Sequence, residues 1–387
     1  MAPSLTSSER LRGGHAQWSG EDVSLDDVLN QLNQLRGAVA SRGIGDYELP
    51  RPRNSVMNLV AIAADQQQAD RAAVVAEELG GKHPSRTIVV EPQGGKGERI
   101  DCTIRSHAHE LLGGAPVQYE EIRLRVWGTR ARLRSLVEPL LAPDVRTHLW
   151  YLATPPWEAE AFLEVLPQVD TLVVDSGSFE RAYDSFLAYS RIAESMRDPQ
   201  GTGDFQWVRL KPWRELLAQC FAPPDRRPLL DAVRSVALDY TGEGRGNRGA
   251  AALLAGWLIC RLDWELDQAQ GGQDRAIYRT PAGEQVEITM RAVPIGASGE
   301  GRIAALRLQS NGGDEALRLE IKRDPKSLER ADLDLGIGDS EPIEQEVGLG
   351  LATASDAELL SELLVSGRRD PIYVSSLRCA AELLRAL

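Results

Sequence analysis

The chain has 387 residues, of which 42% are hydrophobic and 26% charged, a composition typical of a globular protein that is long enough for two domains. Its net charge of −13 argues against a general nucleic-acid binder, because such proteins neutralise phosphates with lysine and arginine, and against docking on an anionic membrane. The N-terminus lacks the apolar core of a secretory signal, and the four cysteines form no zinc or disulfide pattern. We therefore expect a cytoplasmic protein that holds no metal.

The N-terminal region divides into a tail, a helix and a linker. Residues 1–23 are polar and rich in serine, glycine and arginine, which predicts a mobile tail. Ser24 followed by Asp27 is the pattern of a capping box, and leucine and valine then recur at helical spacing. Residues 24–52 are therefore predicted to form an N-terminal helix and an extended linker that contains prolines.

Residues 53–178 alternate between strand and helix patterns. Continuous apolar runs at 87–90 and 171–174 suit strands of a sheet that is covered on both faces. Strands are predicted at 56–63, 86–91, 100–107, 117–127, 148–153 and 171–175, and helices at 66–79, 129–141 and 157–166. This pattern predicts an α/β domain with a mixed or parallel sheet flanked by helices.

Residues 179–387 are predicted to form a second domain, an α+β unit of helices and an antiparallel sheet. Helices are predicted at 179–196, 212–221, 249–262, 356–365 and 375–386, and strands at 233–239, 286–290, 303–309 and 316–322. Leu306 and Leu308 alternate with Arg307, so one face of this sheet should be buried and the other wet. The residues 310–313 between the last two strands are a hairpin signal.

The clearest sequence motif is a glycine-rich loop that matches G-x-G-x-x-G over residues 244–249 and opens a predicted helix. Gly244 and Gly246 would let backbone N–H groups approach a phosphate, and Arg245 and Arg248 would add positive charge. No second strand with an acidic end follows at the spacing that a dinucleotide site needs. Three interpretations stay open: a loop that caps a core helix, an anion or partner site, and a nucleotide-binding α/β enzyme.

The other reactive residues give no catalytic or metal-binding set. His107 and His109 share one face of a predicted strand, but Cys102 falls on the opposite face, so a third ligand is missing. Ser176 follows a strand, as a nucleophile could, yet it lacks the first glycine of G-x-S-x-G and no histidine follows His148. The sequence thus predicts a protein without catalytic residues and without a cofactor.

A short segment rich in tryptophan and arginine is the best candidate for a protein interface. Trp207 and Trp213 bracket Arg209, and Arg214 follows directly. Tryptophan and arginine are enriched in the hot spots of protein interfaces. The alternative is that the tryptophans are large core residues whose indole N–H groups find internal partners.

Several segments taken together carry a family resemblance. In chain order they are HPSRTIVV (83–90), LWYL (149–152) before a Pro-Pro pair, LVVDS (172–176), WVRLKPWRELLAQ (207–219) and LAGWL (254–258). Their order and spacing resemble the OpcA family, the glucose-6-phosphate dehydrogenase assembly proteins of cyanobacteria and actinobacteria. The resemblance runs from about residue 24 to the C-terminus.

The resemblance implies a non-catalytic protein that binds glucose-6-phosphate dehydrogenase, favours its active oligomer and so promotes the oxidative pentose phosphate pathway. On this basis we expect Trp207, Arg209, Trp213 and Arg214 to form an interface segment, with the loop at Arg245 to Arg248 as a second candidate. Some cyanobacterial members respond to redox state through cysteines, and here Cys379 is the candidate, although it has no near partner in sequence. The oligomeric state of the chain, a homo-oligomer included, stays open.

Overall fold

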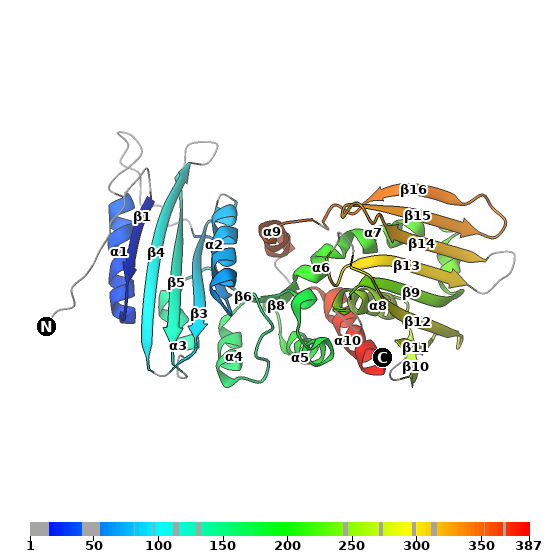
Figure 1. Ribbon diagram of the computed structural model, residues 1–387, viewed down its shortest axis with the longest axis horizontal. Coiled ribbons are helices and arrows are strands. Elements are labelled where there is room, and N and C mark those ends of the chain that lie inside the picture. The colour runs from blue at the N-terminus through cyan, green and yellow to red at the C-terminus, as the bar shows by residue number, and fades with distance from the viewer. Residues whose placement is uncertain are drawn as a thin grey trace. The chain divides into compact units, whose positions relative to one another are not determined.

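A computed structural model gives the fold (Figure 1), and its contacts divide the chain into two compact units, Met1–Val174 and Asp175–Leu387. The predicted α/β class is confirmed. The residues that the structure describes are 15–40, 55–80, 82–95, 97–110, 116–128, 133–242, 247–270, 274–295, 299–310, 316–351, 353–366 and 369–387.

The first unit is a mixed sheet flanked by helices, as the sequence predicts. Its strands follow the order β1 (His15–Gly20), β4 (Arg99–Glu110), β5 (Pro116–Trp127), β3 (Ser85–Gln93), β2 (Met57–Ile62), β6 (Arg146–Tyr151) and β7 (Thr171–Val174). The helices are α1 (Leu25–Ala40), α2 (Gln66–Gly80), α3 (Leu133–Val137) and α4 (Glu160–Val165). From β5 to β7 the neighbouring strands are parallel, whereas β4 and β1 are antiparallel to their neighbours.

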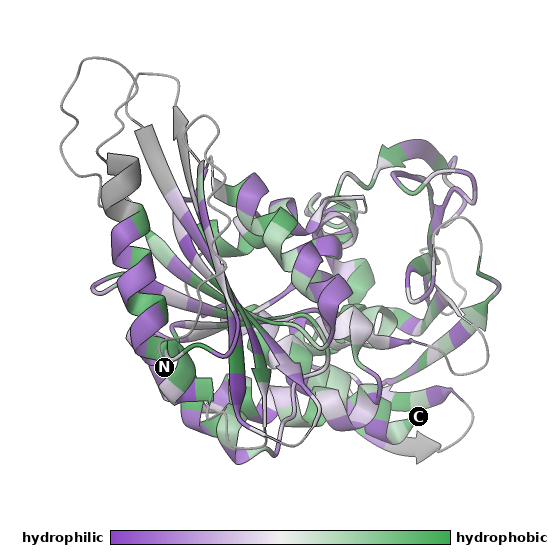
Figure 2. Cartoon of the chain, turned by 60° about the vertical axis from the view of Figure 1, so that its left-hand side comes forward, coloured by the Kyte–Doolittle hydropathy of each residue, from purple (hydrophilic) through white to green (hydrophobic). Residues whose placement is uncertain are grey.

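The capping box at the start of α1 is confirmed. The Ser24 hydroxyl oxygen accepts the Asp27 N–H at 3.2 Å, and the Asp27 carboxylate accepts the Ser24 N–H at 3.0 Å. Along the helix, Val28, Leu32 and Leu35 are buried, and Figure 2 shows hydrophilic and hydrophobic residues side by side on its turns. The 3.6-residue period therefore decides which face of α1 packs on the sheet.

The tail predicted over residues 1–23 is wrong for residues 15–20, because they form the edge strand β1. β1 pairs with β4 over its whole length, from His15 opposite His107 to Gly20 opposite Cys102. Trp18 is only 7% exposed, so the strand buries one large side chain in the core. The alternation of polar and apolar residues over 15–20 is too short to predict a strand unless the neighbouring strand β4 is known.

The second unit carries a sheet with helices packed on one face. Its strands follow the order β10 (Glu265–Gln270), β11 (Arg275–Arg279), β12 (Gln285–Val293), β9 (Val233–Thr241), β13 (Ile303–Ser310), β14 (Leu317–Arg323), β15 (Arg330–Ile337) and β16 (Ile343–Gly348). The helices are α5 (Ala182–Ser195), α6 (Phe205–Arg209), α7 (Lys211–Cys220), α8 (Gly249–Arg261), α9 (Asp356–Ser366) and α10 (Pro371–Ala386), and the short strand β8 (Gly201–Asp204) leads into α6.

The antiparallel sheet predicted for this unit is confirmed for every neighbouring pair of strands except one, because β12 is parallel to β9. The other neighbours pair antiparallel, including the predicted β13–β14 hairpin, whose turn lies outside the described residues. The alternation at Leu306 and Leu308 is confirmed, since both are buried while Arg307 is partly exposed. In the described part of the chain, no helix is long and apolar enough to cross a membrane.

Candidate functional site

The tryptophans of the predicted interface segment lie inside the second unit. Trp207, on α6, is 8% exposed, and Trp213, on α7, is 1% exposed. The indole N–H of Trp207 donates to Oδ2 of Asp370 at 3.1 Å, and Oδ1 of the same carboxylate accepts the first N–H groups of α10. Both side chains are therefore core residues in this conformation, and the indole N–H of Trp207 has an internal partner.

The guanidinium group of an arginine lies over each of the two indole rings. The Cζ atom of Arg214 lies 3.4 Å from the centroid of the Trp207 ring, and its guanidinium donates to the backbone oxygen of Trp207 at 2.7 Å. Burial lowers the pKa of Arg214 to about 10, which still leaves it charged at neutral pH. Arg323, from β14, lies 5.7 Å from the Trp213 ring. These four residues form a cluster that we call the Trp–Arg cluster.

Arg209 is held by an ion pair at the end of α6. Its guanidinium donates to both carboxylate oxygens of Asp175, at 2.8 and 2.9 Å, and the side chain is 13% exposed. None of the four predicted interface residues thus presents a large free surface. Their contact with a partner stays a prediction, and in this conformation they position α6 and α7 instead.

A buried carboxylate that sequence reasoning missed lies next to this cluster. Asp204 is fully buried, and its Oδ1 accepts the N–H groups of Ser176 at 3.0 Å and Gln206 at 2.9 Å. Its Oδ2 accepts the hydroxyl of Tyr373 at 3.1 Å. An aspartate directly before a helix is a sequence signal for an N-cap, but the hydroxyl comes from α10 and no local pattern reveals it.

The glycine-rich loop is only partly described, because Gly244, Arg245 and Gly246 lie outside the described residues. Arg248 donates to Asp274 at 3.0 Å, so its charge is already paired. At Gly249 a Cβ atom would lie 2.9 Å from the backbone oxygen of Ser176, so this glycine allows close packing of α8. Anion binding at this loop, and the nucleotide-binding alternative, stay predictions.

In the first unit, β2, α2 and β3 form the strand–helix–strand arrangement in which dinucleotides bind. The residues at the start of α2, where a pyrophosphate would lie, do not fit that group. At the start of α2, Oδ1 of Asp65 accepts the N–H of Gln68 at 2.8 Å, and the Gln68 side chain accepts the N–H of Ala64 at 2.9 Å. A phosphate needs these N–H groups and the positive end of the helix. The Asp65 carboxylate takes one of them and the Gln68 side chain takes the other, and the carboxylate adds a negative charge at this position.

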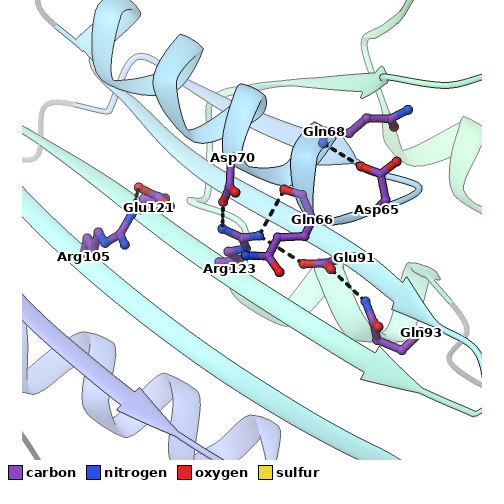
Figure 3. A network of polar contacts seen from close by, with 9 residues as sticks. All are labelled: Asp65, Gln66, Gln68, Asp70, Glu91, Gln93, Arg105, Glu121 and Arg123. Atoms are coloured by element: carbon purple, nitrogen blue, oxygen red, sulfur yellow. Dashed lines mark hydrogen bonds and ion pairs between the residues drawn. The ribbon is translucent and has the colours of Figure 1, made fainter.

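Charged side chains near this helix, some buried and some exposed, are paired with one another (Figure 3). Arg123 on β5 donates to Asp70 on α2 at 2.5 Å and to Glu91 on β3 at 3.2 Å. Glu121, also on β5, pairs with Arg105 at 3.3 Å, while its burial raises the pKa of the carboxyl. The network ties α2 to the sheet.

The remaining candidates give no reactive site in the described residues. No group of three or more histidine, cysteine, aspartate or glutamate residues there could hold a metal ion, and the side chains of His107 and His109 are not described. Ser176 is fully buried. Burial raises the pKa of the Cys379 thiol to about 11, with Cys260 near enough to contribute, and both thiols are free.

Two sequence profiles of one family match the chain. Both are described as domains of a glucose-6-phosphate dehydrogenase subunit; the profile of the C-terminal domain matches residues 200–377, and that of the N-terminal domain matches residues 76–191. The chain belongs to the OpcA family. The predicted resemblance is therefore confirmed, and its two matched regions fall mainly one in each unit.

Cyanobacterial OxPP cycle proteins named OpcA are similar to the chain. The protein of Nostoc punctiforme is 28% identical over 248 residues, which cover 61% of this chain and 52% of the relative. That of Synechocystis sp. is 27% identical over 195 residues, or 49% of this chain and 39% of the relative. The chain thus spans about half the length of the curated relatives it matches.

Solved structures with a related arrangement are more distant. A 3-ketoreductase from Actinomadura kijaniata, in complex with TDP-benzene and NADP, is 14% identical, with 86% of this chain and 96% of the reductase covered and a TM-score of 0.48. A myo-inositol 2-dehydrogenase from Lactobacillus plantarum is 10% identical, with 85% and 96% covered and a TM-score of 0.43. At this level of similarity no ligand or activity transfers to the chain.

Proposed function

We propose that this chain is a non-catalytic assembly factor that binds glucose-6-phosphate dehydrogenase, favours its active oligomer and so promotes the oxidative pentose phosphate pathway. The observation that carries the proposal is the match of both units to profiles named for a subunit of that dehydrogenase. The OxPP cycle name of the cyanobacterial relatives supports it.

The physical mechanism that we propose is a shift of population. A protein that binds the active oligomer tenfold more tightly than the inactive form shifts their equilibrium by about 1.4 kcal/mol per bound copy. Such a protein needs a rigid and complementary surface and no reacting group. The ion pairs at Arg123 and Arg209, together with the Asp65 cap on α2, support this kind of role.

We place a partner contact on the outer side of α7, which the Trp–Arg cluster holds in position. Lys211 and Glu215 lie on this helix; the Lys211 side chain is 42% exposed and pairs with Glu362 on α9, and Glu215 is exposed. Trp213 packs beneath them, 1% exposed. Substitutions at Lys211 and Glu215 should therefore change binding with little effect on stability, whereas a change at Trp213 should lower stability as well.

The test is size-exclusion chromatography of the chain mixed with glucose-6-phosphate dehydrogenase from the same organism, with substrate kinetics measured in parallel. We expect co-elution and an increase in dehydrogenase activity. Lys211→Ala combined with Glu215→Ala should weaken both and change the free energy of urea unfolding by no more than about 1 kcal/mol, because the exposed Lys211–Glu362 pair contributes little. Arg181→Ala combined with Asp184→Ala, which removes an exposed pair in the same unit and also leaves the net charge unchanged, is the matched control. No co-elution and no change in activity would overturn the proposal.

The same purified chain separates this proposal from the nucleotide-binding alternative. Isothermal titration with NADPH, NADP and ATP should give no micromolar binding if the chain acts only as an assembly factor. Micromolar binding that Gly246→Val abolishes would favour an enzyme that uses the loop at 244–249.

A further inference from the structure

The last strand of the second sheet, β16, is an edge strand with an exposed surface. It lies at the end of the strand order, beside β15, as Figure 1 shows in orange. Residues 341–346 are all exposed, and Ile343 is 41% exposed. On the side away from β15, no strand of the described chain pairs with β16. Half of its backbone N–H and C=O groups are therefore open to another strand.

In the hairpin of β15 and β16, acidic residues far outnumber basic ones. Among residues 330–348, the one base is Arg330, and the six acids are Asp332, Asp334, Asp339, Glu341, Glu344 and Glu346. Arg330 pairs with Glu346 at 3.4 Å, and Arg318 on β14 pairs with Asp334 at 3.3 Å. The other four acids have no ion pair within the described residues. The segment keeps a large surplus of negative charge at the open edge.

This charge decides which strand the edge can accept. In a pair of β16 strands from two copies, Glu344 and Glu346 would meet the same two residues, and like charges directly opposite one another are destabilising. The acidic side chains thus protect the edge from self-association. The same acidic side chains favour pairing with a strand that carries lysine or arginine at alternate positions, because each cross-strand pair of side chains is then attractive.

We propose that β16 is a docking edge for an extended, lysine- or arginine-bearing segment of a partner protein, which adds to the sheet as a further strand. The backbone groups of β16 provide the hydrogen bonds, and Glu344 and Glu346 select the basic segment. With six residues, β16 spans about 20 Å and accommodates a segment of about the same length. The inference is independent of the proposed function, since it rests only on the charge and the open backbone groups of this edge.

The probe is a blocked octapeptide of alternating lysine and valine, and binding to the full chain is followed by fluorescence anisotropy. We expect a dissociation constant in the range of tens of micromolar that rises with salt. Glu344→Lys combined with Glu346→Lys should weaken binding at least about tenfold, since two attractions become repulsions. The matched control is Glu158→Lys combined with Glu160→Lys, which changes the net charge equally at exposed residues of the first unit.

Two measurements separate strand addition from plain attraction of opposite charges. A peptide of the same charge that is N-methylated at alternate backbone positions should bind at least about tenfold more weakly, and hydrogen exchange should slow at the β16 amides when the unmodified peptide binds. Equal binding of the methylated peptide, unchanged exchange at β16, or loss of binding in the control variant would overturn the proposal. Dimerisation of the chain through β16 would overturn it as well.

Discussion

The buried carboxyl of Asp204 makes the stability of the second unit depend on pH in an unusual direction. Burial raises its pKa from the ordinary 3.8 to about 6, although the N–H groups of Ser176 and Gln206 donate to the carboxylate and oppose the shift. Between about pH 4 and pH 6 the folded protein therefore keeps a proton that the unfolded chain has released. In that window the contribution of Asp204 to the free energy of unfolding falls as the pH rises, and above pH 6 it stays constant.

The magnitude follows from the two pKa values. A difference between about 6 and 3.8, at about 1.4 kcal/mol per pKa unit, amounts to about 3 kcal/mol. Asp204→Asn removes the titration and keeps the local bonds, because the amide oxygen can still accept the two N–H groups that Oδ1 accepts. The amide N–H can donate to the Tyr373 hydroxyl, which then becomes an acceptor.

The assay is urea unfolding of wild type and Asp204→Asn between pH 4 and pH 8, followed by tryptophan fluorescence. Trp207 reports on this region, since its ring centroid lies 5.3 Å from that of Tyr373. We expect the two proteins to differ little at pH 4 and the variant to be up to about 3 kcal/mol more stable at pH 7. Asp204→Ala, which leaves the N–H donors unpaired, should be less stable than wild type at pH 4. Parallel pH dependences in wild type and Asp204→Asn would refute the reasoning.

Three further predictions concern packing and reactivity. Arg214→Lys should lower the free energy of urea unfolding by about 1–3 kcal/mol, because lysine cannot stack its charge on Trp207 and reach the backbone oxygen at once. Gly256→Ala should cost more than about 2 kcal/mol in the same assay, since the added Cβ would lie 2.7 Å from a backbone nitrogen of α10, whereas Gly348→Ala meets open space and should be neutral. Cys379 should react with a thiol reagent at pH 8 only after unfolding, and fast labelling that Cys379→Ser removes would contradict its burial.

Local signals in the sequence were sufficient wherever one element determines its own structure. The capping box at Ser24 needs only residues within one turn, and the apolar runs that became β3 and β7 are buried whatever their neighbours are. The edge strands β1 and β16 are different, because their sequences are polar and mixed. Each becomes a strand only because the neighbouring strand offers backbone partners, and that neighbour is set by the fold of the whole unit.

The candidate site was harder to predict than the fold for the same reason. Residue types alone left two interpretations of residues 207–214 open, an interface and a packed core, because tryptophan is common both in hot spots and among buried residues. Burial distinguishes the two, and it depends on α10: the Trp207 indole reaches Asp370, and Asp204 reaches Tyr373, 169 positions along the chain. No pattern within the segment carries this information.

The ion pairs of the partly buried arginines are consistent with the proposal that the chain acts by binding a partner. A catalytic acid or base must change its partner or its protonation during turnover, so its environment leaves it poised and reachable by the substrate. In the described chain, Glu91, Glu120 and Asp175 each accept from an arginine, and Asp204 is enclosed beneath Tyr373. Charges fixed in this way hold the surrounding helices and strands in one arrangement. A rigid arrangement of this kind is what a regulator requires, because its differential affinity for two states of a partner depends on fitting only one of them.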